Sequence, residues 1–251
     1  MQRKWWHDKV VYQIYPKSFQ DSNGDGFGDL QGIIKRLDYL ETLGINAIWL
    51  SPVFKSPQAD NGYDISDYRD IDPTFGSLDD MEELINEAKK HNIRIMMDLV
   101  LNHSSNEHMW FKEAKKSKDN PYHDYYIWRD GDEGVPPSDM KACFGGSAWE
   151  YVPEIGQYYF HQFLPEQPDL NWDNANLRQK IYDMMRWWLE KGVDGFRMDV
   201  ISLISKNPDF PDGEVRGLYG DLTPYCAHGP HVHEYLQEMN REVLSKYDIM
   251  T

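Results

Sequence analysis

Residues 176–201 have the pattern of a helix, then a glycine, then a short apolar strand that carries two charged residues. This order restricts the fold more than any other stretch of the chain. Apolar residues recur at helical spacing, and Gly192 follows them as a helix C-cap. Strand side chains alternate between faces, so Arg197 and Asp199 share one face and Val200 belongs to the other, apolar face. Opposite charges near the carboxyl end of a buried strand are typical of a (β/α) barrel, where the chemistry takes place at that end. A purely structural ion pair is the alternative.

The same alternation of strand and helix recurs along the chain. Apolar and β-branched runs predict further strands at residues 10–15, 45–50 and 93–101. Helical periodicity predicts helices at residues 30–43, 77–91 and 231–246, and residues 247–251 look like the start of a fifth strand. The fold class is therefore α/β. We expect a TIM (β/α)₈ barrel of which this chain holds the N-terminal half only, because four strands cannot close the sheet.

The pattern breaks between the third and fourth predicted strands. Residues 104–171 are rich in tryptophan, tyrosine, proline and glycine and show no long helical period. A segment of this length is too long for a barrel loop, so we expect a small inserted domain, domain B. The predicted organisation is a first part of the barrel at residues 1–103, domain B at residues 104–171, and the barrel continued at residues 172–251, truncated at the fifth strand.

The composition excludes some classes of partner. The formal net charge of −16, from 42 acidic and 26 basic residues, argues against nucleic acid and against an anionic membrane. The nine tryptophans and 16 tyrosines suit stacking against the flat apolar face of a ligand. Cys143 and Cys226 lie far apart, so no disulfide framework is expected. Without an apolar leader or a long apolar run, the sequence predicts a soluble, cytoplasmic protein.

The segment DSNGDGFGD after the first predicted strand has the oxygen pattern of a calcium-binding loop. A glutamate is missing from the twelfth position and a strand precedes the loop, so the segment is not an EF-hand. Ca²⁺ is the expected ion and Mg²⁺ the second choice; the alternative is a turn whose polar groups are satisfied by its own backbone. The candidate ligands are the side chains of Asp21, Asn23, Asp25 and Asp29 and the carbonyl of Phe27.

Three stretches together resemble signature sequences of the α-amylase family of glycoside hydrolases: DLVLNH at residues 98–103, QPDLNW at residues 167–172 and GFRMDV at residues 195–200. The motif QPDLN, the calcium-type loop and the ADNGYD segment are similar to the oligo-1,6-glucosidase branch, which includes dextran glucosidase, trehalose-6-phosphate hydrolase and isomaltulose synthase. The resemblance implies a retaining enzyme that forms a covalent glycosyl ester.

The resemblance also implies residue roles. Asp199 matches the family's nucleophile, and Arg197 beside it would keep the carboxylate ionised. His103 and Tyr63 match residues that hold the glucose of the first subsite, by a hydrogen bond and by ring stacking. Asp60 matches the acid that, in the exo-acting branch, binds the hydroxyls of a non-reducing terminal glucose.

Further positions take supporting roles in the same comparison. Asp98 matches a supporting carboxylate, and Gln167 belongs to a substrate-binding motif. Phe144 and Phe163 are expected to wall the pocket, and a place in the core of domain B is the alternative. Val200 resembles the residue found in α-1,6-cleaving members, where its branched side chain would limit the space for the leaving sugar.

One departure limits the resemblance. Retaining hydrolysis needs a second carboxylic acid about 5 Å from the nucleophile, and the family places it as a glutamate at the end of the fifth strand. That position lies beyond Thr251, so the chain alone is expected to be inactive and to need the C-terminal remainder of the barrel. Glutamates of the last predicted helix are expected to face solvent and to be poor substitutes: Glu234, Glu238 and Glu242.

The sequence therefore predicts an exo-acting retaining α-glucosidase that hydrolyses short isomalto- and malto-oligosaccharides. A trehalose-6-phosphate hydrolase and a sucrose-acting transglucosidase are alternatives within the family. A non-catalytic carbohydrate-binding fragment and an ancillary barrel without activity are alternatives of another class.

Overall fold

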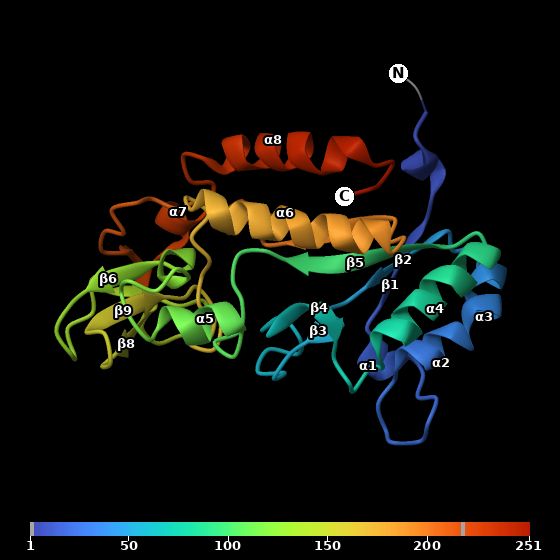
Figure 1. Ribbon diagram of the computed structural model, residues 1–251, viewed down its shortest axis with the longest axis horizontal. Helices are drawn as coiled ribbons and strands as arrows, with labels where there is room; N and C mark the ends of the chain where they lie inside the picture. The colour runs from blue at the N-terminus through green and yellow to red at the C-terminus, as the bar shows by residue number, and fades with distance from the viewer. Residues whose placement is uncertain (1–2, 217–218) are drawn as a thin grey trace.

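The computed structural model describes residues 3–216 and 219–251, and its centre is a four-stranded parallel sheet (Figure 1). Neighbouring strands follow one another along the chain, with helices in the connections, which is the arrangement of a (β/α) barrel. In spatial order the strands are β1 (Val11–Ile14), β2 (Ala47–Leu50), β5 (Arg94–Val100) and β10 (Gly195–Asp199).

Two of the helices around this sheet begin where the sequence supplies a capping side chain. Ser77 caps α4 (Leu78–Lys90) in a reciprocal capping box with Asp80, and Asn174 caps α6 (Ala175–Glu190). The core-facing side of α4 is buried at the spacing that the sequence predicts. Shorter elements on this part of the chain are η1 (Trp5–Asp8), α1 (Pro16–Phe19), β3 (Phe54–Lys55), β4 (Asp67–Ile71) and η3 (Ile201–Leu203).

Two predicted helices are divided in the structure. The helix expected at residues 30–43 is α2 (Leu30–Ile34) followed by α3 (Leu37–Thr42), because Arg36 leaves helical geometry at φ −110° and ψ 7°. The helix expected at residues 231–246 is α8 (Val232–Glu242) followed by the short 3₁₀ helix η4 (Leu244–Lys246). Hydrophobic spacing alone does not reveal a backbone break that keeps the same face buried.

The chain enters a fifth strand position at its last residues. Met250 forms a parallel bridge with Gly195, and the Phe196 amide donates to the Met250 carbonyl at 3.0 Å. The predicted start of a strand at residues 247–251 is therefore confirmed. Helix α8 runs alongside α6 and brings the chain to this position (Figure 1).

The segment after β5 carries a separate antiparallel sheet in the order β6-β9-β8. Its elements are α5 (Met109–Ala114), η2 (His123–Tyr125), β6 (Trp128–Asp130), β7 (Met140–Lys141), β8 (Trp149–Val152) and β9 (Gln157–Phe160). It packs around a second hydrophobic core. The domain limits at residues 103 and 171 stay a prediction.

The long loop after β10 packs onto this segment. It contains β11 (Glu214–Arg216), β12 (Tyr219–Asp221) and α7 (Thr223–Cys226), and β12 pairs with β7. Phe210, Leu222 and Cys226 also contribute to the second core. The segment after β5 therefore shares its core with residues of the loop after β10. Within the described residues, no helix is both long and apolar enough to cross a membrane.

Candidate active site

The charged pair of β10 lies in register with the carboxylate of β5. Arg197 is paired with Asp98 across the two strands, and its Nη1 donates to both oxygens of Asp98 at 3.2 Å and to Asp199 Oδ1 at 2.5 Å. The Asp98 side chain is 0% exposed, whereas that of Asp199 is 13% exposed. Of these two carboxylates, Asp199 is the one that a ligand can reach.

Asp98 is held from several sides. The Trp49 indole N–H donates to Asp98 Oδ2 at 3.0 Å, and the Tyr63 hydroxyl donates to the same oxygen at 3.4 Å. Burial raises the pKa of Asp98 to about 6, although the Arg197 charge opposes the rise. These contacts hold Asp98 next to the Arg197–Asp199 pair, and its role as a supporting carboxylate stays a prediction.

The loops at the carboxyl ends of β2 and β5 meet beside this pair. His103 Nε2 lies 3.1 Å from Gln167 Nε2 and 3.2 Å from the Tyr63 carbonyl oxygen. Gln167 Nε2 also donates to Asp60 Oδ2 at 3.0 Å. Burial lowers the pKa of His103 and raises that of Asp60, so it favours the neutral form of each group. Four residues predicted to contact the sugar thus form one connected group.

Two aromatic rings stand next to His103. The Phe163 ring centroid lies 5.0 Å from that of His103, and Phe144 lies 5.8 Å from Phe163. Phe144 is 60% exposed and neither ring belongs to the second core. The positions favour a pocket wall over the alternative of a domain core.

Val200 does not continue the strand as expected. It adopts a left-handed conformation with φ 40° and ψ 35°, and the chain turns into η3 directly after Asp199. A β-branched residue rarely occupies this region, and such strain is concentrated at functional sites. The prediction that Val200 lies on the apolar strand face is wrong, because the strand ends at Asp199.

A buried polar network below the site was not anticipated from the sequence. Asp169 Oδ2 accepts hydrogen bonds from Asn102 at 3.0 Å and from Gln162 at 2.8 Å, and it pairs with Lys206 Nζ at 3.0 Å. The Lys206 side chain is 4% exposed and that of Asp169 is 0% exposed. The network joins the end of β5, domain B and the loop after β10. Asp169 lies within the QPDLNW motif, whereas no pattern around Lys206 points to its role.

Trp49 is a further residue beside Arg197 and Asp98 that the sequence did not indicate. Its ring lies 4.9 Å from the Arg197 guanidinium carbon, in addition to its bond with Asp98. It is one apolar residue among several in the strand INAIWL, so composition does not distinguish it.

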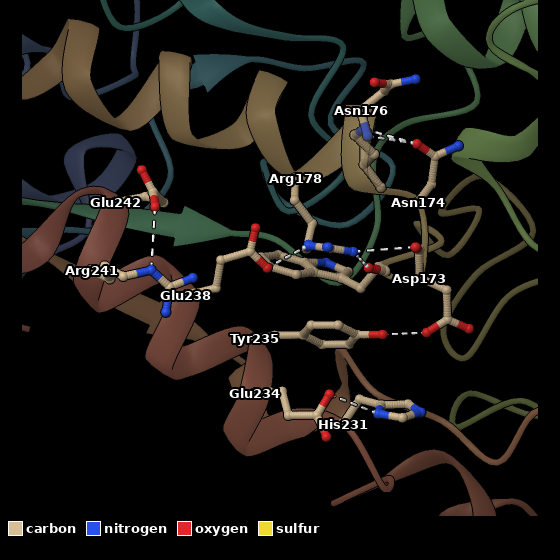
Figure 2. Close-up of polar contacts among 12 residues, drawn as sticks. Asp173, Asn174, Asn176, Arg178, His231, Glu234, Tyr235, Glu238, Arg241 and Glu242 are labelled. Carbon is tan, nitrogen blue, oxygen red and sulfur yellow. Dashed lines mark hydrogen bonds and ion pairs between the residues drawn. The ribbon is translucent and has the colours of Figure 1, made fainter.

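Of the three glutamates of α8, Glu238 contacts α6, whereas Glu234 and Glu242 pair with His231 and Arg241 (Figure 2). Glu238 accepts from Arg178 Nε at 2.8 Å and is 20% exposed, so the expectation that it faces solvent is wrong. Glu234 binds His231 on the exposed surface. The Tyr235 hydroxyl next to them donates to Asp173. These contacts dock α8 onto α6.

In the Asp21–Asp29 loop the polar side chains already bind the loop's own amides. Asp21 accepts from the amides of Asn23, Gly24 and Gly26, and Asp29 caps α2 by accepting from the Gly32 amide at 2.6 Å. Carboxylate and amide oxygens with lone pairs left over suit Ca²⁺, which takes six to eight oxygen ligands. The residue types suit this ion, whereas the hydrogen bonds present are those of the alternative, a turn satisfied by its own backbone. The predicted site stays a prediction.

Comparison with known proteins assigns the family. Residues 13–251 match the alpha-amylase catalytic domain, and the chain belongs to that family. This domain is a TIM barrel, so the fold class is confirmed and the chain corresponds to the N-terminal part of the barrel.

Individual relatives agree with this assignment. The chain is 60% identical over 253 residues to an oligo-1,6-glucosidase from Parageobacillus thermoglucosidasius, with 100% of this chain and 45% of that protein covered. A trehalose-6-phosphate hydrolase structure from Bacillus licheniformis matches 99% of this chain and 44% of its own, with 54% identity and a TM-score of 0.95. An isomaltulose synthase structure from Erwinia rhapontici NX5 has 53% identity and a TM-score of 0.95, over 100% of this chain and 45% of its own. The chain spans about half the length of the relatives it matches.

Proposed function

We propose that this chain supplies the nucleophile and the glucose-binding wall of an exo-acting, retaining α-glucosidase for short isomalto- and malto-oligosaccharides. The observation that carries the proposal is the partly exposed carboxylate of Asp199. Arg197 binds it and also pairs with the fully buried Asp98. The names of the relatives support the substrate class.

The geometry suits attack by a carboxylate. Asp199 would bond to the anomeric carbon as the bond from that carbon to the leaving oxygen breaks, and water would later cleave the ester with net retention. His103, Asp60 and Tyr63 would bind the sugar ring. The hydrogen bond from Gln167 orients Asp60 toward this task.

The leaving oxygen must also receive a proton. Asp98 has a raised pKa, but its side chain is 0% exposed and is bound by Arg197, so a leaving group cannot reach it. The proposed donor is the glutamate that the family resemblance places at the end of the fifth strand. The complete site then requires the C-terminal half of the barrel.

A chimera tests this function. Residues 1–251 are joined to the C-terminal remainder of the Parageobacillus thermoglucosidasius oligo-1,6-glucosidase, whose matching part is 60% identical. The chimera should hydrolyse isomaltose and p-nitrophenyl α-glucoside, and residues 1–251 alone should not. A folded chimera without turnover would contradict the proposal, as would full activity of the shorter chain. Sugar binding without turnover in the chimera would indicate a non-catalytic carbohydrate-binding protein.

Trehalose 6-phosphate and sucrose remain the second candidates, because solved relatives acting on them align with TM-scores of 0.95. Residues 1–251 can be joined in turn to the C-terminal part of an oligo-1,6-glucosidase, a trehalose-6-phosphate hydrolase and an isomaltulose synthase. Rates of these chimeras on isomaltose, maltose, trehalose 6-phosphate and sucrose show how far residues 1–251 determine the substrate. The cytoplasmic location and the absence of nucleic-acid partners stay predictions.

Val200→Thr is expected to shift the chimera's preference from α-1,6 toward α-1,4 linkages. The side chain follows the nucleophile in a strained turn, so its shape limits the room beside the cleaved bond. The ratio of kcat/KM for isomaltose to that for maltose checks this expectation. An unchanged ratio would remove Val200 from the residues that determine linkage.

Ca²⁺ is proposed to bind the Asp21–Asp29 loop and to stabilise the fold by mass action. Saturating Ca²⁺ should add about 2–3 kcal/mol at a hundred times Kd, and a chelator should lower Tm without unfolding the protein. Thermal unfolding with Ca²⁺, Mg²⁺ and chelator measures the effect. Asp25→Asn should weaken the response. A Tm that is unchanged by Ca²⁺, Mg²⁺ and chelator would favour the alternative, a turn whose polar groups are satisfied by its own backbone.

A further inference from the structure

A cluster of three side chains on the outer helices, far in sequence from the catalytic pair, has the composition of a transition-metal site. Asp38 and Glu41 lie on α3, and His91 is the C-cap residue of α4. Residues three apart on a helix share one face, so the two carboxylates point together toward the imidazole. One ligand atom from each of the three side chains lies within 4.8 Å of the others.

The spacing is close to what a small divalent ion requires. His91 Nδ1 lies 2.7 Å from Glu41 Oε2 and 3.7 Å from Asp38 Oδ1. Zinc bonds of about 2.0–2.2 Å to nitrogen and oxygen place neighbouring tetrahedral ligands about 3.3 Å apart. The two distances from His91 must therefore change by less than 1 Å, which side-chain rotation can supply, and Asp38 and Glu41 lie within 4.8 Å of each other.

The charge of this cluster also favours a cation. In the described part of the chain, neither Asp38 nor Glu41 forms an ion pair with a lysine or arginine, and His91 is their one basic neighbour at ion-pair distance. The Asp38 side chain is 94% exposed, which leaves an open path for an ion and space for a water as the fourth ligand. The His91 side chain is 23% exposed and is held by its neighbours.

We propose that Asp38, Glu41 and His91 bind a divalent transition-metal ion, of which Zn²⁺ is the representative, and that the ion links α3 to α4. An imidazole nitrogen with two carboxylates suits Zn²⁺, Co²⁺ or Ni²⁺ rather than Ca²⁺, which prefers oxygen ligands alone. The ion ties together two helices of the outer layer that flank β2 in the chain. Its binding stabilises the folded state, because the three ligands are brought together only after folding.

Untagged protein and ZnCl₂ test the proposal. Zn²⁺ at a hundred times Kd should raise Tm by about 5–10 °C, and titration calorimetry should give one Zn²⁺ per chain at this site. Asp38→Asn should abolish most of the rise without harming the fold, because this side chain is 94% exposed. His91→Gln should do the same, and Ca²⁺ should act equally on wild type and both variants.

His231→Gln is the matched control. His231 Nδ1 lies 3.0 Å from Glu234 Oε2, and this surface pair offers an imidazole and a carboxylate with no third ligand among residues 3–216 and 219–251. The control variant should keep the full response to Zn²⁺. An equal response in wild type and Asp38→Asn, or no response in wild type, would overturn the proposal. These measurements do not depend on glycosidase activity.

Discussion

Asparagine in place of Asp199 is expected to lower kcat of the chimera on isomaltose by about 10⁴-fold or more, while sugar binding persists. The amide keeps the shape of the side chain but cannot form the glycosyl ester. It also removes the charge that Arg197 binds at 2.5 Å, without removing the pocket built by His103, Asp60 and Tyr63. Steady-state rates and the affinity for isomaltose, measured on the same preparation, separate these two effects.

Asp183→Asn serves as the control for that experiment. Asp183 accepts from Arg186 Nη2 at 2.6 Å on the outer face of α6, so it is also an aspartate paired with an arginine, and it is 50% exposed. Its replacement should leave kcat within about twofold. Turnover of the Asp199→Asn chimera near the wild-type rate would show that another group attacks the sugar.

Lys206→Met is expected to cost about 3–5 kcal/mol of unfolding free energy, because it leaves the Asp169 carboxylate buried without its counter-charge. The side chains of the pair are 4% and 0% exposed, so water cannot take the place of the ammonium group without rearrangement. Urea unfolding followed by tryptophan fluorescence measures the loss. Asp169→Asn added to Lys206→Met should recover part of it, because the unpaired charge is then gone.

Lys118→Met provides the comparison for a surface pair. Lys118 Nζ lies 2.6 Å from Asp130 Oδ1, but the two side chains are 48% and 78% exposed. Its loss should lower the free energy of unfolding far less than Lys206→Met does, because water solvates both exposed groups. A cost for Lys206→Met as small as that for Lys118→Met would mean that Asp169 is stabilised by its amide donors alone.

Much of the barrel was predictable because its order is local. Strands such as AIWL (Ala47–Leu50) are continuous apolar runs, and Ser77 caps the helix that follows in the chain. The pairing of Arg197 with Asp199 was predictable for the same reason, since two charges in a buried strand stand out from their neighbours. The remaining site residues were found through the resemblance of short motifs to a family.

What the sequence could not supply depends on contacts between distant segments. Lys206 meets Asp169 and Asn102 across 37 and 104 positions, and nothing in its own neighbourhood signals a buried cation. The left-handed conformation of Val200 could not be predicted, because glycine and asparagine usually mark such positions and this one holds a valine. The pairing of β12 with β7 joins two loops that both lack periodicity.

The second core has a consequence for the order in which the protein forms during synthesis. Trp149 and Phe160 of domain B pack with Phe210, Leu222 and Cys226, which follow the catalytic strand. A ribosome therefore makes β10 before domain B has all of its apolar partners, and domain B cannot mature as an independent N-terminal unit. The β6-β9-β8 sheet and the loop after β10 thus belong to one cooperative unit, which gains or loses order as a whole.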